Sequence, residues 1–311
     1  MNSVNPVPTP VFLAGPTAVG KSEIALALAE KIGGEIITVD SMQVYRGLDI
    51  GTAKPTAEER RRVPHHLLDV CDLKEAFDAA QFTRRARIAA AEIQSRGKTP
   101  VFCGGTGLYF KAFLEGVGET PPGDAKLRAE LETAPLEQLL AELRERDPAT
   151  FEKIDRQNPR RVVRAVEVIR LTGKKFSAQQ AEWKAESGKR KAENYFCFTR
   201  PTEDLRRRIN VRVDEMFARG LMDETRELLQ RGLAENKFAL QAIGYRQVAE
   251  HLRGERGLAE TVELVKIKTR QFAKRQLTWF RRHGNCAGIE LRPGETSDEI
   301  MSQLGYFKIR R

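Results

Sequence analysis

The sequence predicts an α/β fold in which a parallel sheet is flanked by helices and a helical insertion domain interrupts the core. Apolar runs at 11–14, 35–40 and 100–109 each end at a glycine-rich turn or an acid, and amphipathic helical stretches separate them. Strand–helix–strand order with short glycine-rich joints is typical of parallel strands covered by helices. A charged helical block at 117–194 follows, and then YFCFT at 195–199, whose composition indicates a buried strand returning to the sheet.

The first part of the core is expected over residues 1–116. Its first strand leads through a glycine-rich turn into a helix that stops at Gly33–Gly34, since glycine is the usual residue at a helix end. Thr56 and Glu59 have the spacing of a capping box, which predicts the start of a short charged helix. A longer amphipathic helix is predicted at 77–97.

Residues 117–194 are expected to form the insertion domain, beginning in the linker-like stretch GVGETPPGD. The pieces that follow are charged helices with N-cap residues at Asp124 and Asn158. Pro159 stands directly after Asn158, at the favoured first position of a helix. A polar stretch, ESGKRKAEN, closes this block.

The second part of the core is expected over residues 195–311 and is mostly helical. One helix is predicted from an N-cap at Thr202 to Gly220, and a later helix at about 259–282. Residues 266–282 carry seven basic side chains and no acid. Because residues four apart share a helix face, one face carries three cations: Lys266, Arg270 and Lys274. We interpret this face as a contact for an RNA backbone; an ordinary solvated face is the alternative.

The charge balance also favours a polyanionic partner. The chain has 53 basic and 43 acidic residues and a formal net charge of +10, which attracts nucleic acids through counterion release. A merely basic protein with no such partner is the alternative. No apolar run approaches the roughly 18 residues of a membrane span. The N-terminus has neither the basic start nor the apolar stretch of a secretory signal, so we expect a cytoplasmic protein without membrane contact.

The cysteines and histidines do not form a metal-binding pattern. The four cysteines are far apart and include no C-x-x-C pair, so neither a zinc site nor a disulfide framework is expected, in keeping with a reducing cytosol. They are Cys71, Cys103, Cys197 and Cys286. The pair His65–His66 has no third ligand at a suitable spacing, and a polar start to a strand is the better interpretation.

The segment GPTAVGKS matches the phosphate-binding loop G-x-x-x-x-G-K-[ST]. In such a loop, backbone N–H groups surround phosphate oxygens and the following helix N-terminus adds its positive end. The segment follows a strand and opens a helix, which is the expected context for a P-loop NTPase-like fold. Lys21 would neutralise the terminal phosphates, and Ser22 would place its hydroxyl on Mg²⁺. The whole predicted loop is Gly15, Pro16, Thr17, Ala18, Val19, Gly20, Lys21 and Ser22. A glycine turn that only packs is the alternative.

The loop alone does not establish that the phosphates belong to a nucleotide such as ATP. An NTPase usually adds an aspartate at a strand end to hold Mg²⁺ through water, and Asp40 and Asp69 are candidates. Asp40 ends a strand on the sheet edge where α/β proteins bind ligands. It could accept a proton, hold a metal ion or bind an amine, and a turn former is the alternative. Thr106 lies between glycines at another strand end, where a ligand contact and a plain tight turn are equally compatible.

Seven blocks in this order resemble the bacterial tRNA dimethylallyltransferases. They are GPTAVGKS, DSMQVYRGLDIGTAKP, HHLLDV, GGTGLY, NPRRVVRAVEVIRLTGK, QAIGYRQV and TRQFAKRQLTWFR. The resemblance extends from residue 11 to about 282. The first block is unspecific, whereas DSMQVYRGLDIGTAKP and the later blocks are highly specific. The last thirty residues match no motif of that family.

The resemblance implies a reaction. The exocyclic amine of the adenine 3′ of the anticodon attacks the allylic carbon of dimethylallyl diphosphate, and pyrophosphate leaves. It implies that Asp40 is the general base or orients the amine, and that Thr106 steadies the pyrophosphate side. Lys21, Mg²⁺ on Ser22 and an arginine, Arg208 or Arg212, would neutralise the developing charge, a large catalytic contribution in many enzymes.

The resemblance also implies contacts with the anticodon arm of tRNA. The target base must leave its stack to reach the site. The residues implied are Asp40, Ser41, Met42, Gln43, Thr106, Arg128, Gln157, Asn158, Pro159, Arg160, Arg161, Gln241, Ala242, Ile243, Gly244, Tyr245 and Arg246. A monomer is expected.

Two other functions share some of these features. An ATP-dependent kinase for a small molecule or a nucleotide would use the phosphate-binding loop and Asp40 as a base, but it needs no uninterrupted basic block at 266–282. A non-catalytic RNA-binding protein with this loop would not need an acid at position 40. Incubation with ATP, dimethylallyl diphosphate and bulk tRNA separates the three, because the prenyltransferase would consume dimethylallyl diphosphate, the kinase would consume ATP, and the RNA-binding protein would consume neither.

Overall fold

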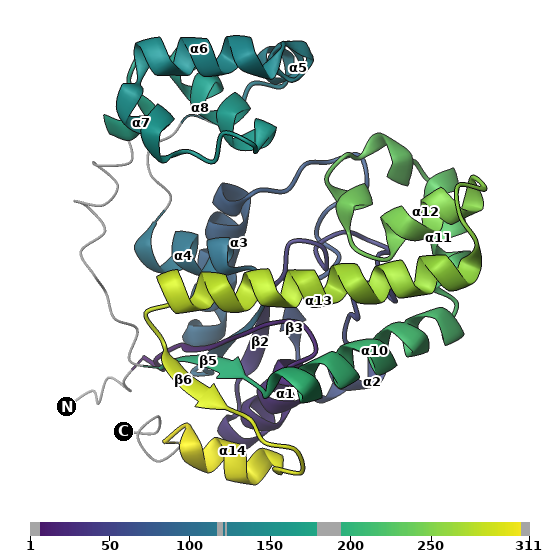
Figure 1. Cartoon of the computed structure of the whole chain (residues 1–311). Helices are drawn as coiled ribbons and strands as arrows, with labels where there is room; N and C mark the ends of the chain where they lie inside the picture. Colours follow the sequence, from purple (N-terminus) through teal and green to yellow (C-terminus); the bar gives the residue numbers. More distant parts are fainter. Residues whose placement is uncertain (1–6, 117–120, 122, 179–193, 306–311) are drawn as a thin grey trace, which may run out of the picture. The chain divides into compact units, whose positions relative to one another are not determined.

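The computed structural model describes residues 7–116, 121, 123–178 and 194–305 and divides the chain into two compact units (Figure 1). One unit combines Met1–Leu114 with Lys191–Arg311, and the other is Glu115–Arg190. The first is thus built from two segments that are distant in the sequence. The boundaries expected at 117 and 194 lie close to those of the second unit.

Six parallel strands form the sheet of the first unit, in the order β3-β2-β4-β1-β5-β6. The predicted α/β class with a parallel sheet is therefore confirmed. Strands were predicted at 11–14, 35–40, 195–199 and the start of 100–109, and His65–His66 was interpreted as the start of a strand; the strand at the β6 edge was not predicted. The strands are β1 (Val11–Ala14), β2 (Glu35–Val39), β3 (His65–His66), β4 (Pro100–Gly104), β5 (Tyr195–Thr199) and β6 (Ala287–Glu290).

Helices cover both faces of this sheet (Figure 1). On one face, Ile24, Ile209 and Ile300 pack with the strands in one apolar core; on the other, Phe82 and Phe110 do so. The helices of this unit are α1 (Lys21–Ile32), α2 (Ala57–Arg62), α3 (Ala79–Ser95), α4 (Gly107–Glu115), α10 (Thr202–Ala218), α11 (Leu221–Gln230), α12 (Tyr245–Leu252), α13 (Leu258–His283) and α14 (Ser297–Gln303), with short 3₁₀ turns at Leu233–Glu235 and Ala239–Gln241.

The second unit is helical and has its own apolar core. Leu131, Leu143 and Val166 pack together in it. Asp124 and Asn158 accept hydrogen bonds from the N–H groups of Leu127 and Arg161, as expected for N-caps. The helices are α5 (Ala125–Thr133), α6 (Leu136–Arg146), α7 (Pro148–Lys153) and α8 (Pro159–Thr172). The stretch ESGKRKAEN lies almost wholly outside the described residues.

Two predicted helix starts in the first unit have different outcomes. Thr56 and Glu59 form the predicted capping box of α2. The predicted N-cap at Thr202 is wrong: Pro201 holds that position, and Thr202 is the first residue of α10. Proline fixes φ near the value that a chain entering a helix needs, so it can precede the first turn without a side-chain cap.

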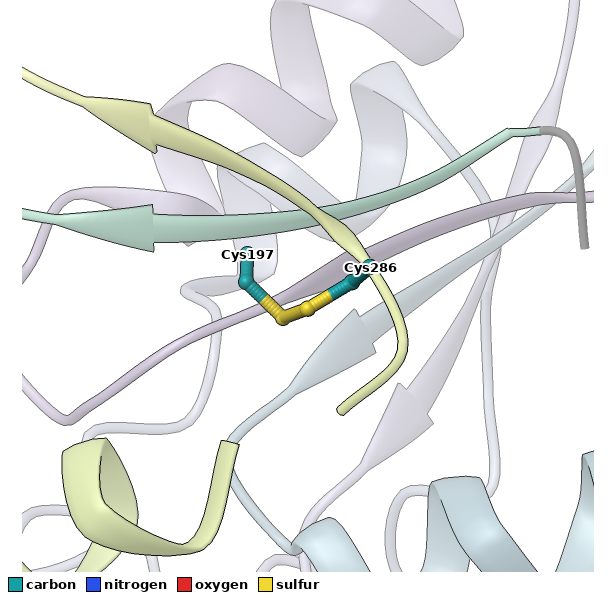
Figure 2. The surroundings of a disulfide bond; sticks show 2 residues. All are labelled: Cys197 and Cys286. Carbon is teal, nitrogen blue, oxygen red and sulfur yellow. A yellow bond between two sulfur atoms is a disulfide. The ribbon is translucent and has the colours of Figure 1, made fainter. Parts of the chain in front are cut away.

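The structure contains a disulfide that the cysteine spacing did not predict. Cys197 of β5 and Cys286, directly before β6, are joined although they are 89 positions apart in the sequence (Figure 2). The expectation of no disulfide is thereby corrected. β5 and β6 are neighbours in the sheet, and the intervening helices bring them together, so sequence spacing alone gives no signal. Cys71 and Cys103 are free and buried.

Candidate active site

The segment Gly15–Ser22 links β1 to α1 as the phosphate-binding motif requires. Gly20 is the N-cap of α1 and has a left-handed backbone conformation, φ 108°. Gly15 has φ 149°, and a Cβ there would lie 2.7 Å from the carbonyl oxygen of Phe198. Only glycine fits these positions without a backbone shift, because side chains disfavour positive φ and Phe198 O leaves no room. The loop therefore has the strand–turn–helix geometry of a phosphate site.

Lys21 is the buried cation of this loop. Its side chain folds back so that Nζ donates a 2.7 Å hydrogen bond to the carbonyl oxygen of Pro16. Burial lowers the pKa of Lys21 to about 8, although the nearby Asp40 carboxylate acts in the opposite direction. A bound phosphate would favour the charged form and raise this pKa, since an adjacent anion stabilises an ammonium.

Arginines of α10 and of the segment after β5 lie against the same loop. Arg208 Nε donates to the carbonyl oxygen of Ala18 at 2.9 Å, and Arg200 Nε donates to that of Val19 at 2.7 Å. Burial lowers the pKa of Arg212, which Asp40 partly offsets. Arg208 and Arg212 both line the cavity at the loop, so the choice between them for the diphosphate stays open. The contact from Arg200 was not expected, because Arg200 belongs to no recognisable sequence motif.

A cavity of about 480 Å³ opens over this cluster. Loop and helix residues both line it, among them Gly20, Lys21, Ser22, Arg208 and Arg212. Five cations and three carboxylates line the opening, so positive charge predominates there: Lys21, Arg207, Arg208, Arg212 and Arg219 against Glu23, Glu59 and Glu215. Such a lining suits a polyanion such as a diphosphate, because each phosphate oxygen accepts several hydrogen bonds. The cavity is thus a candidate site for the phosphates.

Ser22 is suited to Mg²⁺ because it is exposed beside Lys21 at the first turn of α1. Across the described ranges, no group of three or more His, Cys, Asp or Glu residues could hold a metal ion. Mg²⁺ needs no such group, since it keeps several waters and binds through one or two protein oxygens and substrate phosphates. His66 Nε2 instead pairs with Glu35 at 2.7 Å, which explains that histidine without a metal.

Asp40 forms a turn at the end of β2. Its Oδ1 accepts hydrogen bonds from the N–H groups of Met42 and Gln43 at 2.8 and 3.3 Å, while Oδ2 takes part in neither. Ser41 N–H donates to Thr106 Oγ1 at 3.1 Å. The turn-forming alternative for Asp40 is therefore present in the structure, and it leaves one carboxylate oxygen for another partner.

Sequence reasoning missed Gln276, which connects two loops of the site. This buried α13 side chain accepts a hydrogen bond from Thr17 N–H and donates one to the carbonyl oxygen of Gly105, both at 2.9 Å. Ala273 and Phe280, three residues before and four after it, are also buried. The signal was thus a polar residue on the apolar stripe of an otherwise basic helix.

The QAIGYRQ segment supports the loop after Asp40 from inside the protein. Tyr245 is fully buried; its hydroxyl donates to Glu224 at 2.5 Å and accepts from Gly51 N–H at 3.0 Å. The expectation that the Tyr245 side chain contacts tRNA is corrected, and Ala242 is also buried. Arg246 is exposed.

In the second unit, the expected tRNA-binding residues differ in their environment. Arg128 and Arg164 both donate to the fully buried Glu167 at 2.7 Å. Arg128 therefore has a structural partner, because a buried carboxylate needs compensating charge. The run 157–161 is largely exposed at the start of α8, with Gln157, Pro159, Arg160 and Arg161 exposed and Asn158 half-buried.

The basic face of α13 is less free than its sequence indicates. Lys266 pairs with Asp214 of α10 at 2.8 Å and with Glu263 at 3.1 Å, and its side chain is only 13% exposed. Arg270 donates to Asn210 at 2.6 Å. The acid-free stretch 266–282 can still meet acids of a neighbouring helix and of the preceding turn of α13, so Lys266 is not a free cation of the expected row. Lys274 is exposed.

The fold and this cluster define a phosphate-binding α/β protein of the P-loop class. The family model "IPP transferase" matches residues 43–283. A tRNA dimethylallyltransferase of Geobacter metallireducens is 46% identical over 305 residues, covering 96% of this chain and 97% of the relative. A tRNA dimethylallyltransferase 1 of Trichlorobacter lovleyi is 49% identical over 279 residues, covering 88% and 91%.

Solved structures agree. The full-length tRNA isopentenylpyrophosphate transferase of Bacillus halodurans has a TM-score of 0.71 at 37% identity, with 96% of this chain and 95% of that chain covered. A eukaryotic dimethylallyltransferase acting on tRNA has a TM-score of 0.79 at 28% identity, with 98% and 80% covered. The chain belongs to the IPP transferase family, which confirms the resemblance seen in the sequence.

Proposed function

We propose that this protein transfers a dimethylallyl group from dimethylallyl diphosphate to the exocyclic amine of the adenine 3′ of the anticodon in tRNA. The observation that carries this proposal is the meeting of two groups on one sheet edge. Lys21 and the arginines beside the phosphate-binding loop suit a diphosphate. Asp40 suits an amine, and it is close enough to raise the pKa values of Lys21 and Arg212 by its negative charge. Membership of the IPP transferase family supports it.

The diphosphate is the leaving group in this reaction. A bond forms between the amine nitrogen and the allylic carbon, the bond from that carbon to the diphosphate oxygen breaks, and pyrophosphate takes the electron pair. Lys21, Arg208 and Arg212 would neutralise the charge that grows on this oxygen. Charge prepared in advance costs no reorganisation during the reaction, so it lowers the barrier strongly. When bound, Mg²⁺ would add a further positive charge to the diphosphate, and Ser22 would hold it.

Asp40 would orient the amine and receive the proton that the nitrogen loses. Its Oδ1 is occupied by two backbone amides, so we assign the amine contact to Oδ2. Those two bonds also fix the carboxylate's orientation, which is what a positioned base requires. Thr106 would act on the pyrophosphate side: its oxygen accepts from Ser41 N–H, and its own proton is still available to donate.

The tRNA would be held by residues that are exposed or half-buried. We propose contacts from the Ser41–Gln43 turn, from 157–161 at the start of α8, and from Gln241, Ile243 and Arg246 of the QAIGYRQ segment. Phosphate contacts position an RNA, whereas base contacts select it. Across the described residues, no helix is long and apolar enough to cross a membrane. A cytoplasmic monomer is part of the proposal.

Substrate consumption tests this function directly. Purified protein is incubated with Mg²⁺, unmodified tRNA and either dimethylallyl diphosphate or ATP, and pyrophosphate release and tRNA mass are followed. We expect one pyrophosphate per tRNA, a tRNA mass increase of one dimethylallyl group, and no ATP consumption. Consumption of ATP without a change in tRNA would favour the kinase alternative. Loss of activity with EDTA would support the Mg²⁺ assignment.

A further inference from the structure

One amide side chain of α13 connects two loops that approach the sheet edge from different parts of the chain. Gln276 lies opposite the phosphate-binding loop, where Thr17 N–H is 2.9 Å from Oε1, and opposite the loop after β4, where Gly105 O is 2.9 Å from Nε2. The side chain is 7% exposed. All three residues belong to the same compact unit.

The chemistry of the partners fixes the orientation of the amide. A backbone N–H can only donate and a carbonyl oxygen can only accept, so the oxygen must face Thr17 and the nitrogen must face Gly105. Glutamine is the residue of this length that offers both groups while uncharged. An ionised glutamate would place a second acceptor against Gly105, and methionine would satisfy neither loop.

The fit around the loop after β4 leaves little freedom. A Cβ on Gly105 would lie 2.3 Å from Gln276 Nε2, and a Cβ on Gly107 would lie 2.1 Å from Trp279 Cε3. α13 therefore covers this loop with two side chains, the buried Gln276 and the half-buried Trp279. α13 thus restrains a loop whose glycines by themselves permit many conformations, in addition to the bond from Thr106 N–H to the carbonyl oxygen of Val39.

The two hydrogen bonds extend into the site. Gly105 precedes Thr106, whose Oγ1 accepts from Ser41 N–H, and Ser41 follows Asp40. A continuous path of hydrogen bonds and short chain segments thus joins the diphosphate loop, through Gln276, to the turn that carries the proposed base.

We infer that Gln276 is a positioning residue that holds the diphosphate-binding loop in register with the Thr106 loop and the Asp40 turn. This inference rests on the proposed function. In this role Gln276 touches neither substrate, and it acts by fixing the relative positions of the groups that do. A misplacement of about 1 Å between reacting groups can lower a rate about 10²-fold. Most of the proposed tRNA contacts, those at 157–161 and in the QAIGYRQ segment, belong to other segments of the chain, so tRNA affinity should change little.

Three variants test the inference. Gln276→Met keeps length and burial and removes both hydrogen bonds. Gln276→Glu keeps the acceptor for Thr17 N–H and, when ionised, loses the donor to Gly105. Gln271→Met is the matched control, because Gln271 is an exposed glutamine of the same helix. Single-turnover transfer at saturating substrates, the Kd of inorganic pyrophosphate, the Kd of tRNA and thermal melting are measured for each.

We expect Gln276→Met to lower the saturated single-turnover rate by about 10- to 100-fold. The tRNA Kd should stay within about twofold, and Gln271→Met should match the wild type. The pH dependence of the Gln276→Glu rate distinguishes a positioning role from a merely structural one. Its carboxyl, when protonated, again offers one acceptor and one donor, so the ratio of variant to wild-type rate should rise as the pH falls from about 8 to about 6, because burial raises the pKa of a carboxyl.

A Gln276→Met rate within twofold of the wild type would overturn the inference, and so would a Glu-to-wild-type ratio that does not change with pH. If Gln276→Met does not fold, the pH dependence of the Gln276→Glu rate tests the inference instead. If the wild-type protein transfers no dimethylallyl group, the proposed function fails. Pyrophosphate binding then still tests the loop contact: we expect a weaker Kd for Gln276→Met, and an unchanged Kd would overturn it.

Discussion

The backbone N–H of Ser41 donates a 3.1 Å hydrogen bond to Thr106 Oγ1. The bond joins the turn after β2 to the loop after β4, two strands that pair in the sheet with Val39 opposite Gly104. Because the hydroxyl oxygen is the acceptor, the hydroxyl proton is available for a ligand. The acid and the hydroxyl of the candidate site are therefore held together before any substrate binds.

Replacement of Asp40 by asparagine should separate its two roles. The amide oxygen can still accept from Met42 and Gln43 N–H, so the turn should persist, but an amide cannot take the proton. Loss of a general base typically lowers a rate by about 10²–10⁴-fold. We expect a decrease of that size in the single-turnover rate of Asp40→Asn, with tRNA affinity little changed. Near-normal turnover would remove Asp40 from the mechanism.

Lys21 should make pyrophosphate binding depend on pH in the alkaline range. Burial lowers its pKa to about 8, so the ammonium is charged below pH 8 and is lost as the pH rises through that value. The pyrophosphate affinity of the free protein should then fall by up to about tenfold per pH unit above 8.

The Lys21→Ala variant is the comparison. It should bind pyrophosphate weakly at every pH, show no alkaline decrease and have no measurable turnover, while its tRNA Kd stays close to that of the wild type. Lys31→Ala, at the exposed end of α1, controls for the general loss of a positive charge. Equal losses of pyrophosphate and tRNA affinity in Lys21→Ala would contradict the assignment of Lys21 to the diphosphate.

Tyr245 and Arg246 should differ although they are neighbours in the QAIGYRQ segment. The buried Tyr245 hydroxyl donates a hydrogen bond to Glu224 and accepts one from Gly51 N–H. Removal of one partner of a buried hydrogen bond lowers stability by about 1–3 kcal/mol. We expect Tyr245→Phe to lower the free energy of unfolding by that amount and to leave tRNA affinity nearly unchanged. Arg246→Ala should instead lower tRNA affinity and change the free energy of unfolding by no more than about 0.5 kcal/mol.

Urea unfolding and tRNA binding, measured on both variants, check this pair. A Tyr245→Phe protein of normal stability with weakened tRNA binding would restore the original expectation that this tyrosine contacts the RNA.

Local rules predicted those parts of the fold that depend on neighbours in the sequence. The phosphate-binding loop, the capping box of Thr56 and Glu59, and the N-cap at Asp124 each involve residues only a few positions apart. Gln276 depends instead on which loops α13 covers, and the Cys197–Cys286 disulfide depends on the strand order. Such contacts are set by tertiary packing, and a single sequence carries no direct record of it.

The charges available on the basic face of α13 also depend on tertiary packing. Lys266 is paired with Asp214 and Glu263, so its charge is already compensated within the protein. Lys274 is exposed and can meet an RNA phosphate. Each phosphate contact contributes about 0.7–0.9 to the slope of log affinity against log salt concentration. We therefore expect Lys274→Gln to reduce this slope for tRNA by nearly one unit and Lys266→Gln to leave it almost unchanged.

A salt titration of tRNA binding for the wild type, the two single variants and the combined change of Lys266, Arg270 and Lys274 measures these slopes. Phosphate contacts do not read sequence, so Lys274→Gln should weaken the binding of different tRNAs about equally. Pyrophosphate affinity should not change, because Lys274 does not line the cavity over the phosphate-binding loop. An unchanged slope in the triple variant would mean that α13 presents an ordinary solvated face, and the tRNA would then have to be held by other cations.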